Sequence, residues 1–147
     1  MTAKYQHRGA SWRRSGSGDR VTRSSQAWAT ERSLTVTALA SSVAGVVVLR
    51  VIGEVDLITV GLLREQLPKD LHSDCRGLVL DFTGVSFLAG CGIGVLVEIA
   101  EQARADGITL RLVARRRVVL RALEVSLANQ QIPQASTVAE AVVQCAA

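Results

Sequence analysis

Residues 78–94 read LVLDFTGVSFLAGCGIG, and this stretch decides the fold. The run from Gly77 to Phe82 is apolar apart from one aspartate, which is typical of a central strand covered on both faces. Three glycines lie within the five residues that follow Ala89: Gly90, Gly92 and Gly94. From about residue 92 to residue 105 apolar side chains recur with a helical period. The stretch therefore predicts a strand, a glycine-rich loop and a helix.

The segment before this stretch carries a strand pattern and then a helix pattern. Residues 34–39 alternate apolar and polar side chains, and residues 46–52 are rich in β-branched residues, so together they predict a hairpin. Asp56 closes the second strand, and we expect its side chain to cap the next helix. Four residues recur at helical spacing in that helix: Leu62, Leu63, Gln66 and Leu67.

The segment after the stretch continues the alternation. Residues 108–113 predict a strand, and the amphipathic helix after it carries Val118, Leu120, Leu123 and Leu127. A short strand is expected near Ile132, followed by a helix that Ser136 caps. A hairpin followed by alternating helices and strands predicts one α/β domain over residues 34–147, with a mixed sheet and helices packed against it. The 147 residues leave no room for a second domain.

The positive charge of the chain is concentrated at its N-terminus. Of the 17 Lys and Arg residues and 13 Asp and Glu residues, residues 1–33 hold seven and two, so this segment carries +5 and the remainder −1. Residues 1–33 show no apolar period, and we predict a disordered basic tail. Such a tail can bind nucleic acid or an anionic membrane, but a solvated extension is the favoured interpretation.

The cysteine pattern and the apolar runs exclude several classes of protein. Cys75, Cys91 and Cys145 are widely spaced, without a C-x-x-C pair, which argues against both a disulfide framework and a zinc site. No apolar segment resembles a signal peptide or a membrane span. We therefore expect a cytoplasmic protein without a metal or a membrane association.

The glycine-rich loop does not match a phosphate-binding motif. The dinucleotide fingerprint needs its third glycine where Val95 stands, and no Lys-Ser/Thr pair follows as a P-loop requires. Cys91 is a poor candidate for a phosphatase nucleophile, because Val97 replaces the arginine of a C-x5-R motif. A buried small residue is favoured for Cys91, with redox sensing as the alternative. No cofactor is expected.

Three consecutive arginines, residues 115–117, form the one basic cluster of the predicted domain. They suit phosphate or RNA, but the domain has only Phe82 and Phe87 as aromatic residues, both in core-like positions, so no aromatic platform for bases is expected. A solvated loop is the favoured interpretation, with a docking rim as the alternative.

Two motifs together resemble the STAS domain of anti-sigma factor antagonists. They are Gly53-Glu54-Val55-Asp56-Leu57 with Thr59, and residues 78–88 followed by Cys91-Gly92-Ile93-Gly94. The resemblance runs from about Leu34 to the C-terminus and includes the order of elements. It implies a non-enzymatic binding module that sequesters a kinase-type, ATP-dependent anti-sigma factor and so releases an alternative sigma factor. The implied partner-binding residues are Asp56, Thr59, Ser86, Leu88, Ala89, Gly90 and Cys91.

The resemblance also exposes a departure from the family. In that family the loop before the second helix usually reads Asp-Ser-Ser/Thr-Gly, and its first serine is phosphorylated by the anti-sigma factor. Aligned by the flanking residues, this chain has Ala89 for the aspartate, Gly90 for the serine and Cys91 for the next hydroxyl. Glycine offers no oxygen for a phosphoryl group, so we expect no phosphorylation switch at this position. Control is then expected elsewhere: partner abundance, Cys91 oxidation, a hydroxyl such as that of Ser86, or the tail.

Two alternatives from other classes stay open. One is a small-ligand or nucleotide sensor built on the same fold. The other is a nucleic-acid-associated protein that acts through the basic tail, which is the less favoured because the charge lies outside the predicted domain.

Overall fold

The computed structural model describes residues 33–66 and 74–146, and it opens with the predicted hairpin. Strand β1 (Leu34–Ala40) pairs antiparallel with β2 (Val46–Val55). In β1 the buried residues Leu34, Val36 and Ala38 alternate with half-buried ones, as the two-residue period of its sequence predicts. Gly45 adopts a φ of 83° in the connecting turn, a left-handed conformation that favours glycine.

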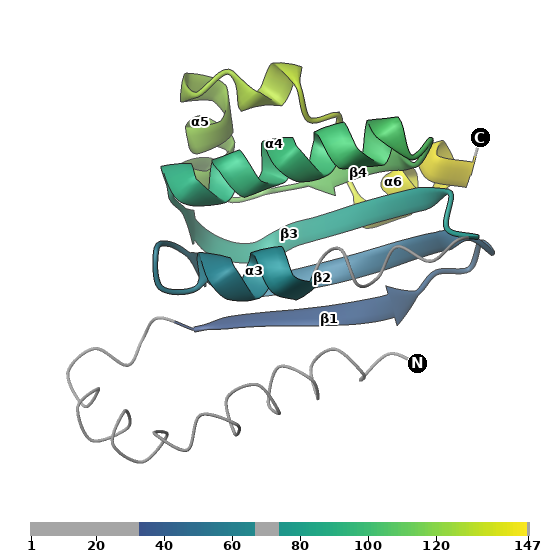
Figure 1. Cartoon of the computed structure of the whole chain (residues 1–147), viewed down its shortest axis with the longest axis horizontal. Coiled ribbons are helices and arrows are strands. Elements are labelled where there is room, and N and C mark those ends of the chain that lie inside the picture. Colours follow the sequence, from purple (N-terminus) through teal and green to yellow (C-terminus); the bar gives the residue numbers. More distant parts are fainter. Residues whose placement is uncertain (1–32, 67–73, 147) are drawn as a thin grey trace, which may run out of the picture.

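The elements after the hairpin follow the predicted order. They are α3 (Val60–Gln66), β3 (Gly77–Leu88), α4 (Gly90–Ala105), β4 (Thr109–Val113), α5 (Arg117–Val125), the 3-10 helix η2 (Ala128–Gln130), β5 (Gln134–Ala135) and α6 (Val138–Ala146). The strand order across the sheet is β1-β2-β3-β4-β5, and Figure 1 shows β1 to β4 side by side in this order. The β1–β2 pair is antiparallel and the other three pairs are parallel, so the predicted mixed α/β sheet is confirmed.

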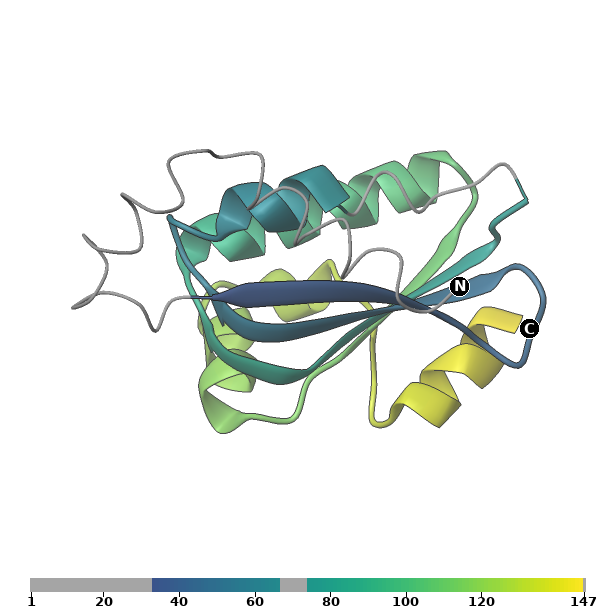
Figure 2. The same cartoon turned by 90° about the horizontal axis from the view of Figure 1, so that it is seen from below.

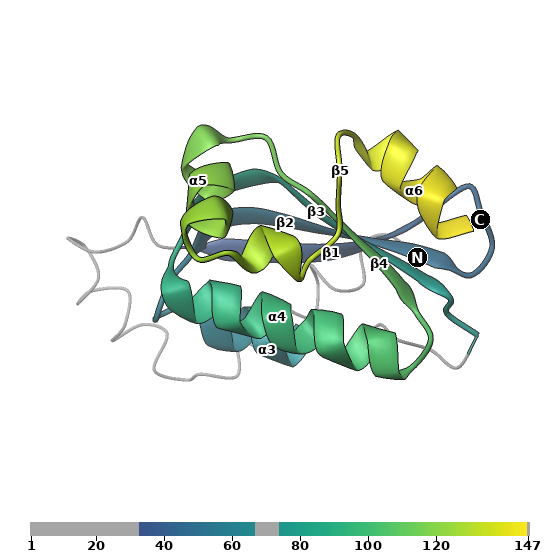
Figure 3. The ribbon, with the colours of Figure 1, turned by 90° about the horizontal axis from the view of Figure 1, so that it is seen from above.

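Helices cover the sheet on both faces, as the apolar run of β3 predicts. Figures 2 and 3 show α3 and α4 on one face and α5 and α6 on the other. Val79 of β3 packs toward α6 with Val46 and Val48, whereas Leu78 and Leu80 belong to the larger core cluster. Both sets are fully or almost fully buried, which explains why the sequence of β3 lacks an alternating pattern.

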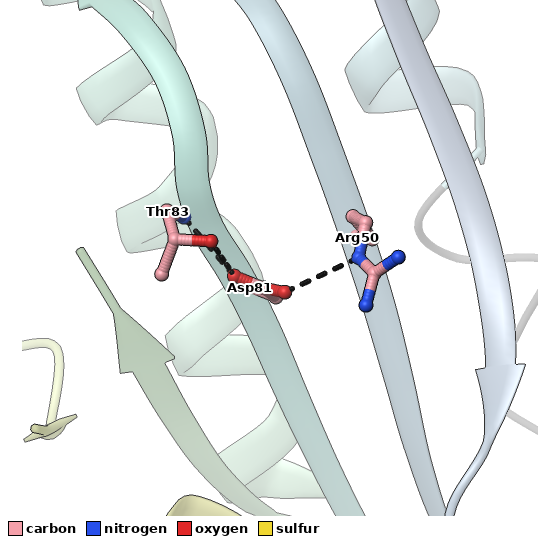
Figure 4. A network of polar contacts seen from close by, with 3 residues as sticks. All are labelled: Arg50, Asp81 and Thr83. Atoms are coloured by element: carbon pink, nitrogen blue, oxygen red, sulfur yellow. Dashed lines mark hydrogen bonds and ion pairs between the residues drawn. The ribbon is translucent and has the colours of Figure 1, made fainter. Parts of the chain in front are cut away.

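Strand β3 is longer than predicted, because two register shifts allow it to stay paired with β2 beyond its polar residues. Arg50 pairs with Asp81 but Ile52 pairs with Gly84, and a second shift follows between Gly53 and Glu54 of β2. The Asp81 carboxylate is buried and accepts hydrogen bonds from the Thr83 backbone N–H (3.0 Å) and hydroxyl (2.7 Å). Its other oxygen lies 3.4 Å from Nε of Arg50 (Figure 4). These contacts give hydrogen-bond partners to the Asp81 carboxylate and the Thr83 N–H at the first register shift.

Two boundary or face predictions are wrong, whereas the short strand expected near Ile132 is present. Strand β3 continues to Leu88 instead of ending at Phe82, so α4 begins at Gly90 and the loop between them is a single residue. In α5 the buried residues are Val119 and Leu123, whereas the predicted Val118, Leu120 and Leu127 are exposed. The short fifth strand lies at Gln134–Ala135, two residues after the buried Ile132.

The cap of α6 is also displaced by one residue from the prediction. The hydroxyl of Thr137, not that of Ser136, accepts the Glu140 backbone N–H at 3.0 Å. The Glu140 carboxylate in turn accepts the Ser136 N–H at 2.7 Å. This reciprocal arrangement is close to a capping box and satisfies two N–H groups at once.

Two predictions fall on residues that the structure does not describe. The proposed basic tail lies outside the described residues except for Ser33, and Leu67 lies outside them as well. Within residues 33–66 and 74–146, no helix has the length and apolar character needed to cross a lipid bilayer.

Candidate protein-binding site

The ends of β2 and β3 bring the two sequence motifs together. Val55 pairs with Leu88, and the Ala89 backbone N–H donates to the Val55 carbonyl at 2.8 Å. Both strands run in the same direction, so the turn after β2 and the start of α4 lie at the same end of the molecule (Figure 1). Carboxyl ends of strands are where α/β sheets commonly bind partners.

Asp56 and Thr59 form a closed network within the turn after β2. One Asp56 carboxylate oxygen accepts the backbone N–H groups of Ile58 (2.9 Å) and Thr59 (3.1 Å). The Thr59 hydroxyl donates to the Glu54 carbonyl at 2.6 Å and accepts the Asp56 N–H at 3.0 Å. Asp56 and Thr59 are only 5% and 7% exposed. Their side chains therefore position the turn and contribute little surface.

The same turn presents two aliphatic side chains to solvent. Leu57 and Ile58 are 83% and 69% exposed, directly between the two buried polar residues. Capping by Asp56 holds the backbone of this turn, so the aliphatic side chains project outward from a fixed support. Phe87, next to the end of β3, is 42% exposed.

The first turn of α4 combines one closely packed glycine with one open one. A Cβ atom on Gly92 would lie 2.4 Å from Cγ1 of Val55, so the helix start rests directly on the end of β2. Gly90 is exposed, and nothing lies within 4 Å of the place where its Cβ would be. Ala89 occupies the N-cap position and offers no side-chain hydrogen bond to the free N–H groups of the first turn. We call Leu57, Ile58, Phe87 and Gly90 together the carboxyl-end surface.

The other predicted site residues lie nearby but are less accessible. Leu88 is buried in the core, and Cys91 is half-buried in the first turn of α4. The Ser86 hydroxyl donates to the Gly53 carbonyl at 3.3 Å, so this hydroxyl is engaged with β2. Among the described residues, no group of three or more His, Cys, Asp or Glu side chains is arranged to hold a metal ion.

The family of this domain follows from its similarity to known protein families. The model of the STAS domain matches residues 38–141. The chain belongs to the STAS domain family. It is 34% identical over 77 residues to the anti-sigma-F factor antagonist RsfB of Mycobacterium tuberculosis, a match that covers 52% of this chain and 62% of that protein. It is also 34% identical over 61 residues to the putative anti-anti-sigma factor Rv2638 of the same species, with 42% and 41% coverage.

Solved structures agree on the STAS fold. An anti-sigma factor antagonist from Mycobacterium paratuberculosis superposes with a TM-score of 0.70 at 24% identity, covering 77% of this chain and 94% of that one. The unphosphorylated form of the anti-sigma factor antagonist SpoIIAA gives a TM-score of 0.61 at 18% identity, with 76% and 95% coverage. At these identities the likeness establishes the fold alone.

Three residues of the carboxyl-end surface of this STAS domain were missed from the sequence. Leu57, Ile58 and Phe87 lie beside predicted site residues, yet each reads as a core residue by composition. The useful signal was local: an aspartate that caps a turn by bonding to the N–H groups two and three residues later leaves the intervening side chains facing outward.

Proposed function

We propose that this STAS domain binds an anti-sigma factor of the ATP-dependent kinase type and thereby releases an alternative sigma factor, without itself being an enzyme. The observation that carries the proposal is the exposure of Leu57 and Ile58 beside the first turn of α4. Burying an aliphatic side chain of this size in an interface is worth about 1.5–3 kcal/mol. The names of RsfB and Rv2638 support the choice of partner.

The proposal includes the absence of a phosphorylation switch at Gly90. Two hydroxyl groups of the predicted site have other roles: that of Thr59 is buried, and that of Ser86 donates to the Gly53 carbonyl. A phosphoryl group adds about −1.5 to −2 charges and would disturb an aliphatic contact wherever it was attached in this region. With no acceptor at Gly90, the complex persists when the kinase is active.

Binding to a purified kinase-type anti-sigma factor from the native host tests the partner. The double variant Leu57→Ser/Ile58→Ser removes the exposed aliphatic groups without touching the Asp56 network. We expect its affinity, measured by calorimetry, to fall by about 10-fold or more, given the energies of aliphatic burial. Val143→Ser is the matched control, because Val143 is 68% exposed on α6. Unchanged affinity of the double variant would contradict the proposed surface.

Phosphate incorporation from labelled ATP tests the missing switch. Wild-type protein should take up no phosphate from the anti-sigma factor, whereas Ala89→Asp/Gly90→Ser should take it up and lose affinity. A serine fits at position 90, because nothing lies within 4 Å of a Cβ atom there. Phosphate found on Ser86 or elsewhere in the wild type would refute the unswitched version while leaving the partner in place.

A further inference from the structure

Arginines and exposed aliphatic side chains are concentrated on one short segment, residues 115–127, which contains α5. The exposed large hydrophobic residues of this segment are Val118, Leu120, Val125 and Leu127, which are 45%, 39%, 75% and 58% exposed. The segment also holds four exposed arginines, Arg115, Arg116, Arg117 and Arg121. The ion pairs within the described part of the chain are Arg50–Asp81 and Arg64–Glu98, and none of these four arginines takes part in them. Glu124 is the one acidic residue here, so the segment carries +3.

The helical period orders these side chains into a charged ridge with apolar flanks. Val119 and Leu123, one turn apart, face the core. Arg117, Arg121 and Glu124 share the opposite side of the helix, because residues three and four apart lie on one face. Val118 and Val125 lie on one flank of this ridge. Leu120 lies on its other flank. The centre of this face thus carries two arginines and Glu124, a net positive charge, with aliphatic surface on both sides.

This arrangement selects among three kinds of partner. A helix that lies on a lipid surface needs a continuous apolar face with the basic residues at its edges, whereas here the arginines are central. Surfaces for single-stranded nucleic acid combine basic groups with aromatic side chains on which bases stack, and the segment has no aromatic residue. A protein surface with carboxylates at its centre and aliphatic side chains around them complements both features, because charge complementarity fixes orientation and apolar burial supplies affinity.

The backbone of Leu127 supports a binding role for the segment. Leu127 has a φ of 63° and is 58% exposed. A leucine in the left-handed region costs about 1–2 kcal/mol relative to glycine, and an exposed leucine gains little from burial in exchange. Strain of this kind gathers at functional surfaces.

We propose that residues 115–127 form a second protein-docking surface, which takes an acidic segment with aliphatic flanks from a partner. This surface shares no residue with the carboxyl-end surface, and the proposal does not depend on the proposed function.

The probe for this surface is a short labelled helical peptide with glutamates one turn apart and leucines on both sides of them. Binding to the full chain is measured by fluorescence anisotropy, and the contact is mapped from NMR shifts of the Val118 and Val125 methyl groups. The charge-reversal variant Arg117→Glu/Arg121→Glu should bind the peptide about 10-fold or more weakly, as expected for close charge pairs. Arg104→Glu is the matched control, because Arg104 is exposed on α4.

A charge swap makes the test specific. A peptide with lysines in place of the glutamates should bind the reversed variant more tightly than it binds the wild type. The proposal is overturned if the glutamate peptide does not bind, if its shifts map outside residues 115–127, or if the reversed variant binds it as well as the wild type does. Binding of phosphatidylglycerol vesicles or duplex DNA through these arginines, in place of the peptide, would assign the segment to lipid or nucleic acid and equally overturn it.

Discussion

At the scale of single residues, Leu127 combines a branched side chain with a left-handed backbone conformation. It is the one non-glycine residue with a positive φ in the described part of the chain, and it follows α5 where helices usually place glycine. Leu127→Gly should raise the free energy of unfolding by about 0.5–1 kcal/mol, because relief of the left-handed conformation exceeds the added freedom of glycine in the unfolded chain. Urea unfolding measures the change. Leu127→Ala keeps the strain and should show no such gain; an equal gain in both variants would mean that the exposed side chain, not the backbone, was the cause.

A second residue-scale prediction concerns the hydroxyl of Thr59. This hydroxyl both donates to the Glu54 carbonyl and accepts the Asp56 N–H while 7% exposed. Thr59→Val preserves the shape but leaves the buried Asp56 N–H and the part-buried Glu54 carbonyl without this partner, so stability should fall by about 1–3 kcal/mol. Thr59→Ser retains the hydroxyl and should lose clearly less in the same unfolding experiment. Equal losses would show that the methyl group carries the effect.

At the scale of elements, α4 distinguishes two glycines that the sequence presents alike. Alanine at position 92 would bring Cβ within 2.4 Å of Val55 and 2.8 Å of Leu88, whereas nothing lies within 4 Å at position 94. Gly92→Ala should therefore destabilise the protein by about 1–3 kcal/mol through overpacking. Gly94→Ala should stabilise it by about 0.5–1 kcal/mol, since alanine favours the helix. Thermal unfolding of the two variants compares them; shifts of the same sign would contradict this account.

The elements also show how far the sequence determines the fold. Existence, type and order of the strands and α-helices were predictable, because burial on the sheet imposes a period that the apolar residues follow, whereas the 3-10 helix η2 was not predicted. The end of β3 was not, since Thr83, Gly84 and Ser86 read as turn residues. They remain in the strand because the Asp81 carboxylate satisfies the Thr83 N–H at the register shift.

The candidate site was also predictable from the sequence only in part. The positions of both motifs followed from their place at strand ends, which the parallel pairing of β2 and β3 then brought together. The outward direction of Leu57 and Ile58 did not follow, because it depends on the hydrogen bonds that draw Asp56 and Thr59 inward. Sequence period alone does not report such a network.

At the scale of the whole molecule, the two proposed surfaces lie at one end and the C-terminal helix at the other. Figures 1 and 3 show α5 at the end where α4 begins, and α6 toward the opposite end. Helix α6 therefore contributes to neither surface, and its packing on the sheet can be tested separately through Cys145. This residue is 3% exposed, and a Cβ atom on Gly77 would lie 2.6 Å from its own Cβ. It fixes α6 against the first residue of β3.

Burial raises the pKa of the Cys145 thiol, and the positive charge of Arg111 opposes this only in part. An unfolded cysteine ionises near pH 8.5, so above this pH the unfolded chain loses the proton while the folded chain retains it. The contribution of the thiol to stability is complete below the unfolded pKa and is lost as the pH rises through the folded pKa.

The free energy of unfolding of the wild type should therefore decline more steeply above about pH 8.5 than that of Cys145→Ala. Urea unfolding of both proteins across this range measures the two slopes. Cys145→Ala should be less stable at every pH because it loses packing, so the slope and not the level is decisive. Parallel curves would show that folding does not raise the pKa of the thiol.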